Sequence, residues 1–232
     1  ILSITNVIFP RLSRLTAGGE EGAFRDTLRQ TVHTSLFFVF PMSAGLMAVA
    51  RPLVSFLYGG GTFDGFSVQI TSTALVWSSL GMAGYGVQNV LSRAYFARQQ
   101  GRGPLLAGAA AIAVNILLCM VLTDPFSVAG LAFASAVSST VYALLLLIPL
   151  ERRGEGVLDK PFAADLLKML AAAVLTGLCA WGVLCGLEQL LPGGKLSELA
   201  SLCLCALAGV LVYFGAAFAL GLPEAKLALL AV

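Results

Sequence analysis

The chain has 232 residues, of which 58% are apolar and only 11% are charged, and its mean hydropathy is +0.91. Soluble proteins average roughly 45 to 50% apolar and about 25% charged residues, so this composition excludes an ordinary soluble domain. The formal net charge of +2 is small, and the basic residues lie at the ends of apolar segments, which excludes a nucleic-acid-binding stripe. The composition therefore predicts an all-α, polytopic integral membrane bundle.

Apolar segments long enough to cross a bilayer recur along the chain. A hydrocarbon core about 30 Å thick requires roughly 20 apolar helical residues. The predicted full spans are 30–58, 67–92, 103–122, 128–149, 163–190 and 197–222. The shorter apolar segment 1–9 is predicted to be the second half of a severed span that stops at Pro10, so we expect the chain to be the C-terminal part of a longer protein.

Lysine and arginine alternate between the gaps that separate these segments. Twelve of the fourteen lie in or beside every second gap, whereas the intervening gaps contain only Arg51 and Lys195. Because cytoplasmic loops carry an excess of Lys and Arg, the basic gaps and the C-terminus near Lys226 are predicted to be cytoplasmic.

The same pattern predicts how the chain is divided. We expect the end of a severed helix and a cytoplasmic loop over 1–29, and then four transmembrane helices over 30–150. A cytoplasmic loop over 151–162 and two additional C-terminal transmembrane helices over 163–232 follow. The short amphipathic stretch 24–29 fits either an interfacial lead into the first full span or a plain extension of that helix.

The sequence gives no pattern for a metal, a cofactor or a redox centre. All five cysteines fall inside predicted spans without CxxC spacing, and His33 is the only histidine. Buried small apolar residues and a hydrated interfacial histidine are the expected roles. No cofactor is therefore predicted.

Pro41 lies inside the first full span, and Pro52 lies near its outer end. A proline frees a backbone carbonyl and kinks a helix, which membrane proteins tolerate where neighbouring groups satisfy that carbonyl. Bent helices often line transport paths, but prolines are also common in membrane spans generally, so both interpretations remain open.

Polar side chains occur within two predicted spans, at Asn115 on one and at Ser135, Ser138, Ser139 and Thr140 on the next. Such groups usually bond to neighbouring helices. A cation site that includes Asn115 and Ser135 is the alternative. Hard cations prefer oxygen ligands, and the neighbouring Cys119 offers a thiol instead, which argues against that alternative.

One segment, 92–104, combines an aromatic pair, a polar turn and a proline that opens the next span: SRAYFARQQGRGP. It resembles the lipid II flippase family (MurJ, also called MviN). Three further segments resemble family motifs in the same order: 7–14 its LPxLS helix end, 51–64 its external turn, and 128–139 its AGLxLxxxxS helix start. Gln100 departs from the family, which often has an Asp there, so a charge contact at that turn is in doubt.

The resemblance implies a two-lobe fold like that of the multidrug/oligosaccharidyl-lipid/polysaccharide exporters, in the bacterial cytoplasmic membrane. This chain would supply the end of span eight and spans nine to fourteen, and its partners would be lipid II, membrane lipids and a missing N-terminal lobe. The activity implied is lipid II transport rather than catalysis, and the fragment alone is expected to be inactive.

The family's cavity arginines lie upstream of this chain, so none of its basic residues matches them. Arg51 and Arg93 lie closest to span interiors and remain candidates for the cavity or the interface. The last two spans are rich in Gly and Ala, which lets helices approach closely. The resemblance adds that these two helices form a groove for the lipid tail, for which Trp181, Phe214 and Phe218 are candidates.

Other classes of protein stay open at this point. An exporter of another polyprenyl-linked saccharide is the nearest alternative, and a non-catalytic membrane assembly subunit would show similar apolar spans. A membrane enzyme acting on polyprenyl diphosphates would need clustered carboxylates or a catalytic histidine, but Asp64 and Asp124 are isolated in the sequence.

Overall fold

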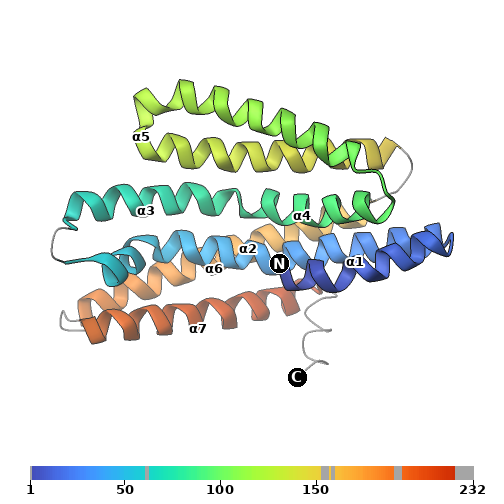
Figure 1. Ribbon diagram of the computed structural model, residues 1–232. Coiled ribbons are helices and arrows are strands. Elements are labelled where there is room, and N and C mark those ends of the chain that lie inside the picture. The colour runs from blue at the N-terminus through green and yellow to red at the C-terminus, as the bar shows by residue number, and fades with distance from the viewer. Residues whose placement is uncertain (1, 61–62, 153–156, 158–159, 191–194, 223–232) are drawn as a thin grey trace.

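The computed structural model describes residues 2–60, 63–152, 157, 160–190 and 195–222. These residues form an all-α bundle (Figure 1). Its helices are α1 (Leu2–Ala17), α2 (Glu21–Tyr58), α3 (Gly65–Leu80), α4 (Met82–Ala97), α5 (Arg102–Arg152), α6 (Lys160–Leu190) and α7 (Lys195–Ala219). Lys226 and half of the predicted loop 151–162 lie outside the described residues.

The helices run roughly side by side, so the turns between them gather at two ends of the bundle (Figure 1). The basic end, at the right of Figure 1, holds the turns α1–α2 and α4–α5 and the last turn of α5. The opposite end holds the α2–α3 turn and the reversal inside α5. The gaps that are rich in arginine in the sequence thus lie together at one end of the bundle.

The six crossings that the sequence predicts can be matched to helices of the bundle. By length and composition α2, α5, α6 and α7 are long and apolar enough to cross a membrane. Helix α5 contributes two crossings, because the chain reverses at Ser127, whose φ of 48° and ψ of −128° are not helical. Helices α3 and α4, which follow one another along the chain, together correspond to the remaining predicted crossing.

Two local predictions differ from the structure, and the structure resolves one alternative that the sequence left open. The predicted span 67–92 is two helices separated at Gly81 rather than one. Helix α1 does not stop at Pro10 but continues to Ala17, because Leu12 beyond the proline is fully buried in the core and the packing offsets the lost backbone bond. The stretch 24–29 is a plain extension of α2, in which Phe24 and Leu28 are buried.

Helix α2 is the central element of the bundle, since it packs against α1, α3, α4, α6 and α7. Its buried face includes Phe24, Leu28 and Phe37, which join one continuous core with Leu91 of α4 and Leu146 of α5. Lipid tails are as apolar as these side chains, so close packing and interhelical hydrogen bonds hold such a bundle together.

The break at Gly81 is held between two other helices. The Ser43 hydroxyl of α2 donates to the carbonyl of Ser79 at 2.6 Å, and the Ser139 hydroxyl of α5 donates to the carbonyl of Gly81 at 3.2 Å. A Cβ atom on Gly81 would stand 2.5 Å from the Cα of Ala136, so α3 and α5 approach closely here. The break is therefore a packed and hydrogen-bonded feature.

Gly81→Ala is expected to destabilise the bundle by about 1 to 3 kcal/mol, because the added methyl must push α5 away. Unfolding of the detergent-solubilised chain by SDS measures this loss. Gly182→Ala in α6 is the matched control, since a Cβ there meets nothing within 4 Å and alanine is the better helix former. Equal stability of the two variants would contradict the close approach at Gly81.

Asp64 caps α3 at the opposite end, where its carboxylate accepts the backbone N–H of Ser67 at 2.9 Å. This hydrogen bond lowers the pKa of Asp64 below its ordinary value of 3.8. Because the folded-state pKa is the lower one, the ionised cap stabilises α3 fully above the unfolded pKa and loses this effect as the pH falls through the folded pKa.

We predict that the amide resonance of Ser67 titrates with a midpoint below 3.8 in an NMR pH series. The titration should vanish in Asp64→Asn, which keeps an oxygen acceptor but has no acidic proton. A midpoint at or above 3.8, or a titration that persists in the Asn variant, would show that the cap does not form.

Candidate functional site

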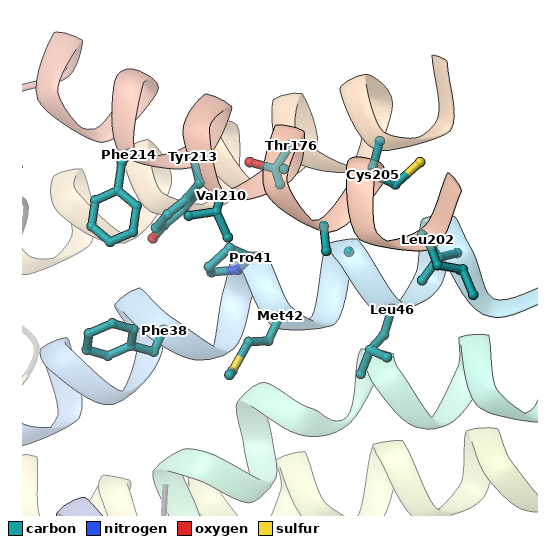
Figure 2. Close-up of a pocket in the computed structure, with 15 residues that line it drawn as sticks. Phe38, Pro41, Met42, Leu46, Thr176, Leu202, Cys205, Val210, Tyr213 and Phe214 are labelled. Carbon is teal, nitrogen blue, oxygen red and sulfur yellow. The ribbon is translucent and has the colours of Figure 1, made fainter. Parts of the chain in front are cut away.

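An apolar groove of about 340 Å³ lies between α2, α6 and α7 (Figure 2). Helix α2 contributes one wall, helix α7 contributes the other, and Thr176 and Ala180 of α6 lie between them. The α2 wall consists of Phe38, Pro41, Met42, Gly45, Leu46 and Val49. The α7 wall runs from Leu202 to Phe214 and includes Cys205, Val210 and Tyr213.

Small residues let α6 approach both of its neighbours behind the groove. A Cβ on Gly177 would lie 3.5 Å from Ala44 of α2, and one on Gly209 of α7 would lie 3.4 Å from the Thr176 methyl. The Thr176 hydroxyl donates to the carbonyl of Ala172 in its own helix at 2.8 Å. The groove surface is therefore almost entirely hydrocarbon, even where a threonine lines it.

Aromatic rings gather at one end of the groove. Figure 2 shows Phe38, Tyr213 and Phe214 at that end and Leu46 and Leu202 at the other. Behind the wall, the Phe37 ring packs on Tyr213 with 5.1 Å between centroids and on Phe214 with 6.1 Å. The aromatic end lies toward the N-terminus of α2, which is at the basic end of the bundle.

The groove is suited to binding a hydrocarbon chain. Its α2 wall extends over residues 38–49, which corresponds to about 16 Å at 1.5 Å per helical residue. It contains no charged side chain. Burial of apolar surface is the interaction that such a lining provides.

The three aromatic residues predicted for a groove are found in different places. Phe214 lines the groove. Trp181 of α6 and Phe218 of α7 are 61% and 41% exposed and do not line it. The family resemblance predicted a groove formed by the last two spans, and it did not predict that α2 forms one wall. The signal was present, because Phe38, Met42 and Val49 recur at helical spacing on one face.

The two candidate arginines are far from each other along the bundle. Arg51 is exposed on α2, two turns before that helix ends at the opposite end. Arg93 is half-buried one turn before the end of α4 at the basic end, with its guanidinium carbon 5.8 Å from the centroid of the Phe9 ring. Neither arginine lines the apolar groove.

The polar residues of α5 form a second, smaller cavity of about 290 Å³ with Gln88 of α4. Asn115 donates to the Ser138 hydroxyl at 3.3 Å and accepts a weak bond from the Cys119 thiol at 3.7 Å. The other candidate, Ser135, donates instead to the carbonyl of Leu131 in its own helix.

These groups do not fit a hard-cation site. Cys119 offers a soft thiol rather than an oxygen ligand beside Asn115, and no carboxylate lines this cavity. Across the described residues, no three His, Cys, Asp or Glu side chains come close enough to share a metal ion. The polar residues of α5 serve as hydrogen-bond partners between and within helices.

A bundle with several helices long and apolar enough to cross a membrane is the architecture of a polytopic membrane protein. Comparison with known proteins identifies the protein family. The family model described as lipid II flippase MurJ matches residues 1–214. The chain therefore belongs to the lipid II flippase MurJ family.

Individual relatives agree with this assignment. The chain is 27% identical over 222 residues to a probable lipid II flippase MurJ of Rhizobium meliloti, covering 95% of the chain and 42% of the relative. It is 30% identical over 183 residues to a probable lipid II flippase MurJ of Vibrio cholerae, covering 78% and 34%. The chain thus spans about two fifths or less of the length of these curated relatives.

A solved structure shows the same fold. The bundle superposes on a lipid II flippase MurJ in an inward closed conformation with a TM-score of 0.73 at 23% sequence identity. The match covers 92% of this chain and 41% of that structure's chain. The predicted all-α membrane bundle of this family is confirmed.

Proposed function

We propose that this chain is part of the C-terminal half of a lipid II flippase, which moves undecaprenyl-diphosphate-linked peptidoglycan precursor across the bacterial cytoplasmic membrane. Family membership over residues 1–214 supports this proposal most directly. The apolar groove adds to it, because the substrate of such a protein carries a long hydrocarbon tail. The partners are then lipid II, membrane lipids and the part of the longer protein that precedes this chain.

The physical task of such a protein is to move a polar, anionic headgroup through hydrocarbon, where charges without partners are costly. A cavity between two lobes, opened alternately to each side, lowers that cost. While the headgroup moves, the groove of α2, α6 and α7 would hold part of the hydrocarbon tail of lipid II within the bilayer. Residues 30–150 would then belong to the C-terminal lobe, and 163–232 would supply the additional helices beside it.

The distribution of charges supports one orientation. Arginines at the α1–α2 and α4–α5 turns lie at one end of the bundle, and we place this basic end in the cytoplasm. The chain would then finish on the cytoplasmic side after α7. Arg51 would lie near the outer surface and Arg93 near the cytoplasmic one, where each suits an interfacial anchor or the rim of a cavity.

The test uses vesicles that contain fluorescent lipid II, in which reagent accessibility reports flipping. We expect the 232-residue chain alone to be inactive, because the diphosphate needs charged partners that its groove lacks. The chain joined behind the preceding part of the Vibrio cholerae relative should accelerate flipping. Flipping by the chain alone, or a folded fusion without activity, would contradict the proposed role.

A matched pair of variants connects the groove to this activity. Gly45→Phe places a ring into the groove, and Gly182→Phe places the same ring on an open face of α6; neither Cβ meets an atom within 4 Å. In the active fusion, Gly45→Phe should slow flipping several-fold, whereas Gly182→Phe should not. Equal rates would exclude the groove from lipid transport.

A further inference from the structure

Pro41 interrupts the hydrogen bonding of α2 at the middle of the groove wall. Proline has no N–H, so the carbonyl of Phe37, four residues earlier, loses its helical partner. Hydrocarbon offers no replacement, and an unbonded carbonyl within it is costly. This carbonyl therefore needs a donor from elsewhere in the protein.

The donor comes from a helix that is distant in sequence. The Tyr213 hydroxyl of α7 donates to the carbonyl of Phe37 at 2.6 Å. Tyr213 is 2% exposed and Phe37 is fully buried, so the bond is shielded from both water and lipid. The two rings also pack together at 5.1 Å, which fixes the orientation of the phenol.

Both sides of this contact belong to the groove. Pro41 and Tyr213 line its facing walls, and Phe214 follows Tyr213 at the aromatic end. A phenol that must reach one particular carbonyl sets both the rotation of α7 and its height along α2. The position of the α7 wall thus depends on a backbone defect in the α2 wall.

We propose that Tyr213 is a positioning residue for lipid-tail binding: its bond to the carbonyl freed by Pro41 holds α7 where the groove accepts a hydrocarbon chain. The identity of the occupant rests on the proposed function above. The bond between α2 and α7 itself is a property of this chain and is testable without any lipid.

The proline makes this inference testable by a double-mutant cycle. In Pro41→Ala the backbone N–H of residue 41 bonds to the carbonyl of Phe37, so the Tyr213 hydroxyl is no longer required there. Tyr213→Phe should then be harmful when Pro41 is present and nearly harmless when it is absent. Loss of ring packing cannot produce this dependence, because phenylalanine keeps the ring.

The lipid-free measurement is SDS unfolding of the whole 232-residue chain in four forms: wild type, each single variant and the double variant. We expect Tyr213→Phe to raise the equilibrium constant for unfolding about three- to tenfold when Pro41 is present. In the Pro41→Ala background the same substitution should raise it less than twofold. Additive effects of the two substitutions would overturn the proposed bond.

The binding measurement uses a C20 isoprenoid diphosphate with a photoreactive diazirine on its chain, added to the chain in nanodiscs. In wild type, labelling should fall on peptides from 38–49 and 202–214. Tyr213→Phe should reduce this labelling about three- to tenfold, and by less than twofold in the Pro41→Ala background.

Tyr95→Phe is the matched control, because the Tyr95 hydroxyl also donates to a buried carbonyl, that of Leu146 at 3.0 Å, but away from the groove. It should lower stability while leaving labelling within twofold. If Tyr213→Phe behaves like this control, the positioning role is wrong. Wild-type chain without groove labelling would refute the lipid-tail groove, and the unfolding cycle alone would then decide whether the Tyr213 bond exists.

Discussion

A hydrocarbon layer offers no hydrogen bonds, so each interruption of a helix within it must be satisfied by another helix. Two places in this bundle illustrate that constraint. The carbonyl of Phe37, freed by Pro41, accepts from Tyr213. At the break between α3 and α4, the carbonyls of Ser79 and Gly81 accept from serine hydroxyls of α2 and α5. At these two places a departure from regular helix coincides with a hydrogen bond between helices.

This constraint explains why α2 organises the bundle. One stretch of α2, from Phe37 to Ser43, receives the Tyr213 bond of α7 and donates the Ser43 bond to α3. The same stretch carries Pro41, which lines the groove. The local backbone defect, the contacts between helices and the apolar groove thus depend on one another. A substitution here is expected to affect stability and lipid binding together.

The sequence predicted the features that depend on composition and charge. Long apolar runs predicted six crossings, and the alternation of Arg and Lys predicted that the turns at 18–20 and 98–101 lie at one end. Such signals can be read from sequence because bilayer thickness and the cost of charge act on each segment separately. The motifs in 92–104 and 128–139 pointed to the family that comparison then confirmed.

Features that depend on contacts between distant segments escaped prediction. Nothing near Pro10 indicates that Leu12 beyond it is buried, and Gly81 is one glycine among many until Ala136 packs against it. The groove was assigned to the last two spans, although α2 forms a whole wall. The phenol of Tyr213 and the carbonyl of Phe37 are joined only by the folded structure.

The proposed topology is a bundle that crosses the membrane six times with its basic end in the cytoplasm. Single cysteines at four exposed positions in a cysteine-free background test it most directly: Glu20, Phe66, Arg102 and Asp124. With a membrane-impermeant maleimide on intact bacterial cells, Phe66→Cys and Asp124→Cys should react, whereas Glu20→Cys and Arg102→Cys should react only after permeabilisation. The reverse pattern would contradict the orientation, and mixed reactivity at either end would contradict the bundle itself.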